Sequence, residues 1–195
     1  MPSVYQLKPA FQGLLRPVAG SLVRLGVTAN QVTVAACAVS VALGLDLAYG
    51  SKRWLLLPVW LFVRMALNAI DGMMAREHGQ ASRLGALLNE LTDVIADAAL
   101  LLPFAFVPGW NPAMVGLVVV LAGLTEMTSV VGLALTGVRR NDGPMGKSDR
   151  ALWQGVIAVW LYLGWPYHEL FGPLLALFLV ATVYNRARHI LTKEE

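Results

Sequence analysis

Long apolar stretches recur along the whole chain and alternate with short polar segments. Each stretch approaches the roughly 20 mostly apolar residues that a helix needs to cross a bilayer. The pattern therefore predicts six membrane-spanning helices. They are expected near residues 29–49, 54–75, 84–106, 111–137, 150–166 and 171–187.

The segment before the first predicted span has a different pattern. Residues 3–24 mix apolar positions with basic residues such as Lys8 and Arg16. This mixture favours an amphipathic helix lying in the membrane interface. We expect this helix to bend at Pro9 or Pro17, because proline removes a backbone hydrogen bond.

The composition agrees with an all-α membrane protein. Of the 195 residues, 57% are hydrophobic and 14% are charged, against about 25% charged in a soluble domain. We expect a juxtamembrane segment over residues 1–27 and one six-helix transmembrane domain over residues 28–195, with Thr28 or Asn30 capping the first span. We find no nucleic-acid-binding motif and no internal repeat, and Cys37, the single cysteine, excludes an intrachain disulfide.

The basic residues predict the orientation in the membrane. If the N-terminus is cytoplasmic, 12 of the 15 Lys and Arg residues lie on the cytoplasmic side, as the positive-inside rule requires. Both termini are therefore expected in the cytoplasm, and for most of these residues topology is a sufficient explanation. The twelve are Lys8, Arg16, Arg24, Arg76, Arg83, Arg139, Arg140, Lys147, Arg150, Arg186, Arg188 and Lys193.

Polar side chains cluster in the second and third predicted spans, where they are costly and usually functional. Asn68 and Asp71 are three residues apart, and Asn89 and Asp93 are four apart, so each pair shares a helix face. Antiparallel neighbouring helices would bring the two faces into one pocket open to the cytoplasm. Oxygen ligands of this kind suit Mg²⁺ or Mn²⁺. The alternative is a polar network that only holds the helices together.

Small residues accompany this polar face. Gly72 follows Asp71 directly, and Ala75 lies one turn further on. They would let a base or a diphosphate approach the backbone, although tight helix packing explains small residues equally well. Deeper in the membrane, Arg64, Asp97 and Glu126 are expected at similar depth. We favour a structural ion-pair cluster for these three, with a proton path as the alternative.

The polar and small residues together form a longer motif. The chain reads N-x-x-D-G-x-x-A-R-x8-G-x3-N-x3-D from Asn68 to Asp93. This segment resembles the signature of the CDP-alcohol phosphotransferases, D-x-x-D-G-x-x-A-R-x8-G-x3-D-x3-D. Six of the eight fixed positions match: Asp71, Gly72, Ala75, Arg76, Gly85 and Asp93.

The resemblance implies a function for each matching position. Gly72, Ala75, Arg76 and Gly85 would accommodate the cytidine diphosphate of a CDP-linked lipid, for which CDP-diacylglycerol is expected. Asp71 would be a metal ligand. Asp93 would be a ligand and the base that deprotonates the alcohol acceptor, with CMP released during phospholipid synthesis. The resemblance also implies a homodimer in a bacterial inner membrane, with the active site at the cytoplasmic face.

The chain departs from the signature at two positions. Asn68 and Asn89 replace the first and third aspartates, and an amide oxygen can bind a cation but carries no charge. We therefore predict one firmly held Mg²⁺ or Mn²⁺ ion, with a second held weakly or not at all. Lost activity is one interpretation, and an altered metal number or substrate is the one we prefer.

The sequence defines the residues that would bind the acceptor less clearly. The loop over residues 137–151 is rich in basic residues and leads into a helix N-terminus, which favours anions. In relatives this region holds the phosphate of an alcohol-phosphate acceptor, whereas topology alone is the alternative. The basic residues concerned are Arg139, Arg140, Lys147 and Arg150. The competing functions are a CDP-lipid pyrophosphatase that uses water and a non-catalytic subunit that binds lipid or nucleotide.

Overall fold

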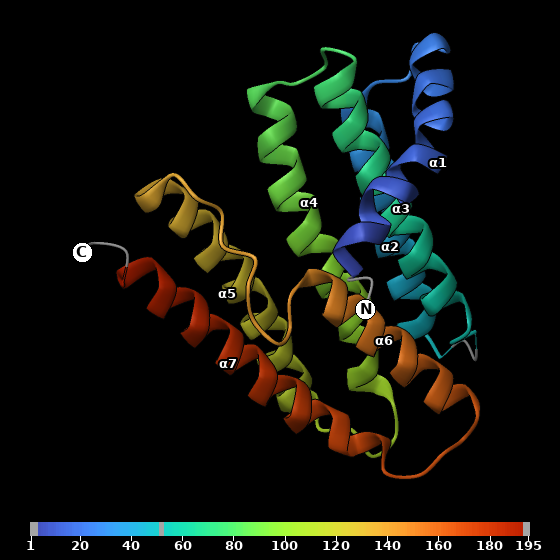
Figure 1. Cartoon of the computed structure of the whole chain (residues 1–195). Helices are drawn as coiled ribbons and strands as arrows, with labels where there is room; N and C mark the ends of the chain where they lie inside the picture. Colours follow the sequence, from blue (N-terminus) through green and yellow to red (C-terminus); the bar gives the residue numbers. More distant parts are fainter. Residues whose placement is uncertain (1–3, 51–52, 193–195) are drawn as a thin grey trace. The chain divides into compact units, whose positions relative to one another are not determined.

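The computed structural model describes residues 4–50 and 53–192, and the regular structure among them is helical. The all-α prediction is therefore confirmed (Figure 1). The α-helices are α1 (Val4–Arg24), α2 (Ala29–Ala48), α3 (Leu56–Glu77), α4 (Arg83–Leu101), α5 (Pro112–Thr136), α6 (Lys147–Tyr162) and α7 (Phe171–Leu191). Two short 3₁₀ helices, η1 (Leu102–Phe106) and η2 (His168–Leu170), precede α5 and α7.

Each of the six predicted spans corresponds to one of these helices. Among the described residues, four helical stretches are long and apolar enough to cross a membrane: α2, α3, α5 and the stretch His168–Leu191, which contains α7. The other two predicted spans fall outside this group. α4 carries Glu90, Asp93 and Asp97 in its interior, and α6 has only 16 residues. A crossing by α4 and α6 therefore stays a prediction.

The chain forms two compact units. The first unit contains Met1–Val39 and Phe62–Asp93, and the second contains Ser40–Leu61 and Val94–Glu195. The boundaries between them fall inside α2, α3 and α4. The N-terminal helix α1 belongs to the first unit. The division into a juxtamembrane segment over residues 1–27 and a transmembrane domain over residues 28–195 stays a prediction.

The first unit has its own small apolar core. Ala19 of α1 is fully buried, and it packs in a cluster with Ala29 and Val32 of α2 and with Ile70, Met73 and Met74 of α3. The start of α2 is capped by Thr28. The Thr28 hydroxyl accepts a hydrogen bond from the Gln31 backbone N–H, and the Gln31 side-chain oxygen accepts one from the Thr28 backbone N–H. Of the two expected capping residues, Thr28 is therefore the one that caps the helix. The Asn30 side chain lies beside Gly85.

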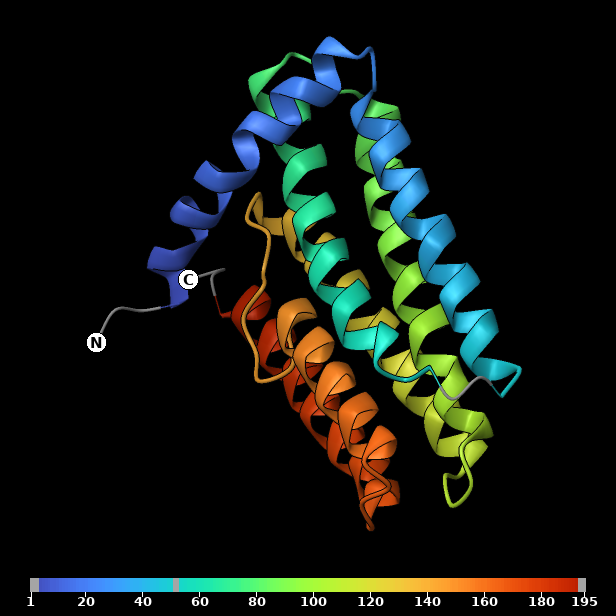
Figure 2. The same cartoon turned by 90° about the vertical axis from the view of Figure 1, so that its right-hand side faces the viewer.

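The second unit is built on two helices that lie side by side, α5 and α7 (Figures 1 and 2). The start of α5 is fixed by the Asn111 side chain, which accepts from the Ala113 N–H at 2.9 Å, and by Pro112 in the first turn. The helix ends at Gly137, whose φ of 69° is in the left-handed region that glycine tolerates.

α2 and α4 approach each other very closely in the second unit. A Cβ built on Gly44 would lie 2.1 Å from the backbone oxygen of Ala99. Backbone cannot move aside as the end of a flexible side chain can, so only glycine allows this approach.

We therefore expect Gly44→Ala to lower the free energy of unfolding by about 1–3 kcal/mol or more, as overpacking does. Gly116→Ala is a matched control, because it also lies inside a helix and a Cβ there meets nothing within 4 Å. The control should be neutral, or stabilising by up to about 1 kcal/mol. Thermal unfolding in one detergent compares the two, and equal melting temperatures would show that α2 and α4 are not held at this distance.

Candidate active site

Asp71 is held in the first unit by a hydroxyl group from a second helix. It lies on α3, with only 5% of its surface exposed. Its Oδ2 accepts a hydrogen bond from Thr33 Oγ1 of α2 at 2.7 Å. Thr33 is itself buried, and its hydroxyl also lies 3.0 Å from the Ala29 carbonyl oxygen. Thr33 could not be recognised from the sequence, because hydroxyl side chains are common in apolar helices and bond to their own backbone there.

Asp93 of α4 is bound by two donors from α3. Arg64 Nη2 lies 3.3 Å from Asp93 Oδ1 and 3.2 Å from the Asp93 backbone oxygen. Asn68 Nδ2 donates to the same Oδ1 at 3.3 Å. Arg64 and Asn68 are one turn apart on α3, so one face of α3 meets Asp93.

This contact brings together the two polar faces that the spacing predicted. Asn68 and Asp71 lie on the same side of α3, and Asn68 contacts Asp93 directly. Asn89 lies one turn before Asp93 on α4 and is half-buried. The motif residues of α3 and α4 therefore belong to one compact unit of the chain.

Polar side-chain atoms lie directly against two glycines of the motif. A Cβ on Gly72 would lie 3.1 Å from both terminal nitrogens of Arg76, so the guanidinium folds back over Gly72. A Cβ on Gly85 would lie 2.8 Å from Asn30 Oδ1 and 3.0 Å from Ser82 Oγ. Asn30 therefore borders Gly85 rather than capping α2. This placement could not be predicted from the sequence, because it depends on how α2 packs against α4.

The predicted metal ligands carry few negative charges. Among residues 4–50 and 53–192, no three His, Cys, Asp or Glu side chains are grouped so that they could hold a metal ion. Of the four predicted oxygen ligands only Asp71 and Asp93 carry charge, and Asn68 points its amide nitrogen toward Asp93. A half-turn of that amide would present its oxygen instead.

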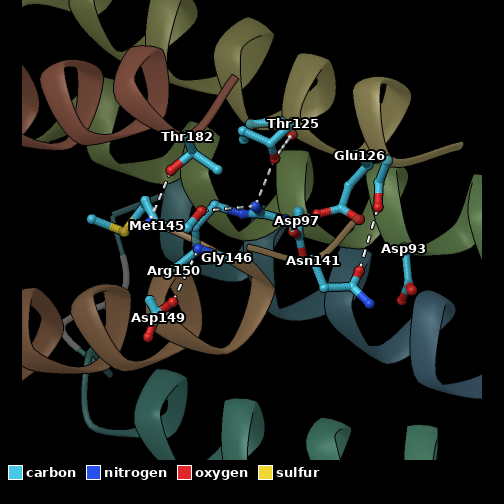
Figure 3. Close-up of polar contacts among 12 residues, drawn as sticks. Asp93, Asp97, Thr125, Glu126, Asn141, Met145, Gly146, Asp149, Arg150 and Thr182 are labelled. Atoms are coloured by element: carbon cyan, nitrogen blue, oxygen red, sulfur yellow. Dashed lines mark hydrogen bonds and ion pairs between the residues drawn. The ribbon is translucent and has the colours of Figure 1, made fainter. Parts of the chain in front are cut away.

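A second polar cluster lies in the second unit, around Arg150 of α6 (Figure 3). Arg150 is 3% exposed, and its Nη2 lies 2.8 Å from Asp97 Oδ2 of α4 and 2.7 Å from Glu126 Oε1 of α5. Its Nη1 donates to Thr125 Oγ1 at 2.8 Å. An ion-pair cluster around Asp97 and Glu126 is therefore present, but its cation is Arg150, which was expected in the basic loop. Arg64, the cation expected with these two carboxylates, contacts Asp93.

The loop between α5 and α6 is fixed to α7 by Arg186, which is 2% exposed. Its Nε donates to the Asp142 backbone oxygen at 2.9 Å, and its Nη1 donates to the Thr125 backbone oxygen at 2.5 Å. His189 also contacts the Asp142 carboxylate. Burial raises the pKa of the Asp142 carboxyl. The hydrogen bond to His189 and nearby positive charges together lower the pKa by more, so it lies below its ordinary value.

Contacts with other groups of the protein engage Arg139, Arg140 and Arg150, which were predicted to bind an anion. Arg150 is engaged by two carboxylates, and Arg139 Nη2 lies 3.8 Å from Glu126 Oε2. Arg140 Nη2 donates to the His189 backbone oxygen at 3.4 Å. Lys147 begins α6 and is half-buried. Because Arg150 and Arg139 both face Glu126, an anion at this loop would compete with a carboxylate of the protein itself.

Comparison with known proteins identifies what the chain is similar to. Residues 26–184 match the family model for the CDP-alcohol phosphatidyltransferases. The chain is 46% identical to the inner membrane protein YnbA of Escherichia coli, over 97% of this chain and 96% of that protein. It is 29% identical to the phosphatidylinositol phosphate synthase of Mycobacteroides abscessus, over 95% of this chain and 87% of that enzyme.

Solved structures share the fold. The phosphatidylinositol phosphate synthase of Mycobacterium tuberculosis in complex with manganese and citrate aligns with a TM-score of 0.78 and 24% identity, covering 91% of this chain and 89% of that one. The same enzyme with CDP-DAG bound aligns with a TM-score of 0.77 and 23% identity, covering 91% and 94%. At these identities the likeness establishes a shared fold.

The Arg150 cluster leads to a prediction about stability. Arg150→Met leaves Asp97 and Glu126 buried beside each other without their shared cation. We expect the free energy of unfolding to fall by about 3–5 kcal/mol, as when one partner of a buried ion pair is removed.

Arg139→Met is the matched control, because Arg139 also lies near Glu126. The Arg139 side chain is 32% exposed, and its Nη2 is 3.8 Å from Glu126 Oε2. It should cost no more than about 1 kcal/mol. Denaturant unfolding in mixed micelles measures both variants. Equal losses would show that burial does not set the strength of these pairs.

Proposed function

The chain belongs to the CDP-alcohol phosphatidyltransferase family, and we propose that it transfers a phosphatidyl-type group from a CDP-linked lipid to an alcohol. CMP is the second product, and phospholipid synthesis is the process served. The observation that carries this proposal is the contact between Asn68 and Asp93, which joins the two halves of the motif in one compact unit. CDP-diacylglycerol is the expected donor, supported by the solved relative that contains CDP-DAG.

Asp93 acts as the general base. The acceptor oxygen forms a bond to the phosphorus that carries the lipid, and the bond from that phosphorus to the CMP oxygen breaks. The hydroxyl proton passes to the Asp93 carboxylate as the new bond forms, and later leaves to water. A base placed in this way typically contributes about 10²–10⁴-fold to the rate.

The cytidine diphosphate would lie against the small residues of the motif. Gly72, Ala75 and Gly85 are small, polar atoms lie beside Gly72 and Gly85, and Arg76 supplies positive charge next to Gly72. Guanidinium groups suit phosphate because they can donate two parallel hydrogen bonds. The fold of Arg76 over Gly72 supports a role for Arg76 at the diphosphate.

One Mg²⁺ or Mn²⁺ ion would be held by Asp71 and Asp93, with amide oxygens from Asn68 and Asn89. When bound, such an ion polarises the diphosphate and offsets the negative charge that the leaving CMP gains. The solved relative in complex with manganese supports this choice of cation.

The acceptor is an alcohol or an alcohol phosphate. Arg140 and Lys147 support a phosphorylated acceptor, whereas the pairing of Arg139 and Arg150 with Glu126 supports a neutral one. We further propose that the protein lies in the bacterial inner membrane as a homodimer, with both termini and the active site on the cytoplasmic side. Similarity to an inner membrane protein supports the location.

A non-catalytic role is the second candidate function. The Asn68 amide bonds directly to Asp93, so the two residues can hold each other without a cation between them. A subunit that binds lipid or nucleotide without turnover would retain such a pair. A CDP-lipid pyrophosphatase differs from both, because water would replace the alcohol.

Purified full-length protein in lipid nanodiscs provides the test. It is incubated with CDP-diacylglycerol, with Mg²⁺ or Mn²⁺, and with matched acceptors such as inositol and inositol phosphate, and the products are identified by mass spectrometry. We expect metal-dependent CMP release together with a new phosphodiester lipid. CMP with phosphatidic acid, formed without any acceptor, would instead indicate the pyrophosphatase.

Two variants test the roles assigned to the two carboxylates. Asp93→Asn should lower CMP release by about 10²–10⁴-fold, because the base is lost. Asp71→Asn should also lose metal-dependent nucleotide binding. Asp46→Asn is the control, because Asp46 pairs with Arg53 in the second unit, and it should turn over like the wild type. Full activity of Asp93→Asn would refute the assigned base, and a wild type that binds nucleotide without releasing CMP would favour the non-catalytic role.

A further inference from the structure

Arg64 is a buried cation that the motif does not explain. It lies in the middle of α3 with 5% of its surface exposed, and its side chain reaches Asp93 of α4. A buried guanidinium is costly in an apolar helix unless it is paired. Its Nη2 lies 3.3 Å from Asp93 Oδ1 and 3.2 Å from the Asp93 backbone oxygen, so it binds the same residue at two points.

Asn68 completes this arrangement. Its Nδ2 donates to Asp93 Oδ1 at 3.3 Å, so one carboxylate oxygen receives a charged donor and a neutral donor from the same face of α3. A carboxylate at position 68 would repel Asp93 at this distance and would need a cation between the two. The amide removes that need, because it offers an N–H where a second carboxylate would offer only acceptors.

The charges near Asp93 limit how many cations the site can accept. Asp71 and Asp93 contribute two negative charges and Arg64 one positive charge. One divalent cation would leave an excess of one positive charge among these groups, and a second would leave an excess of three. An excess of that size is costly inside an apolar helix pair, where water does not screen it.

We propose that Arg64 is a positioning residue that supplies a permanent positive charge to Asp93 in place of a second divalent cation. It holds the carboxylate through Oδ1 and excludes a divalent ion from that oxygen. The resting protein then accepts one Mg²⁺ or Mn²⁺ ion at most. This inference rests on the proposed function only in taking Asp71 and Asp93 as the cation-binding carboxylates.

The first test uses the wild-type full-length chain in nanodiscs, with Mn²⁺ alone as the probe. Electron paramagnetic resonance of free Mn²⁺ gives the number of ions bound, and thermal unfolding with and without Mn²⁺ gives the stabilisation. We expect no more than one tightly bound ion per chain. Two tightly bound ions in the wild type would overturn the proposal.

The second test removes the arginine. Arg64→Met should melt at a lower temperature than the wild type without metal, because Asp93 loses its charged partner. Mn²⁺ should restore much of that loss, and Mn²⁺ affinity should rise about tenfold or more, because a nearby positive charge no longer repels the ion. Arg64→Lys keeps the charge and should bind Mn²⁺ like the wild type.

Two further proteins keep this test decisive if Arg64→Met is too unstable without metal. Arg64→Met combined with Asp93→Asn removes both charges, so it should regain stability and should show no extra stabilisation by Mn²⁺. Arg53→Met is the control: this exposed arginine pairs with Asp46 in the second unit, and its loss should leave Mn²⁺ binding unchanged. An Arg64→Met protein whose melting and Mn²⁺ affinity do not respond as described would show that Arg64 only joins the helices.

None of these readouts depends on turnover. If CMP is never released but the Mn²⁺ results follow expectation, the transferase proposal fails and the role of Arg64 stands. If CMP is released and the wild type binds two Mn²⁺ ions tightly, the role of Arg64 fails and the transferase proposal stands.

Discussion

A charge inside an apolar helix must be paired, because water cannot solvate it there, and this constraint organises both units of the chain. In the first unit, Arg64 joins α3 to α4 through Asp93. In the second, Arg150 joins α6 to α4 and α5 through Asp97 and Glu126. Asp93 and Asp97 are only one turn apart on α4, yet each is bound by an arginine from a different helix. The ion pairs thus determine which side of each helix faces inward, and apolar packing fills the space around them.

The same constraint links the sequence to the chemistry of the candidate site. A cluster of carboxylates can remain close together only when cations separate them, whereas an amide beside a carboxylate forms a hydrogen bond directly. Asn68 is such an amide, and it occupies one oxygen of Asp93 together with Arg64. The change from acid to amide therefore alters more than the total charge. It replaces a contact that depends on metal with one that the protein makes by itself, and it keeps α3 and α4 joined when no cation is bound.

Much of this architecture could be predicted from the sequence, and the reasons are physical. Helix ends follow from local signals, such as Asn111 and Gly137 around α5, and the shared face of Asn68 and Asp71 follows from helical spacing. Partners between helices could not be predicted in the same way. Arg150 was expected in the basic cytoplasmic loop over residues 137–151, but the first turn of α6 carries it inward to two carboxylates. Thr33 gave no signal either, since its role depends on α2 packing beside α3.

The glycines of the motif lie next to polar groups of the protein. Gly72 alone would be explained by close helix packing, but the guanidinium of Arg76, rather than a neighbouring helix, lies nearest to the space above it. Gly85 is likewise bordered by Asn30 and Ser82, which are polar groups and not apolar packing partners. Polar atoms beside the glycines give this part of the motif hydrogen-bonding groups, which a diphosphate or a base requires and an apolar packing interface does not. These polar surroundings favour the proposal that the glycines belong with the polar residues of the motif in one binding site.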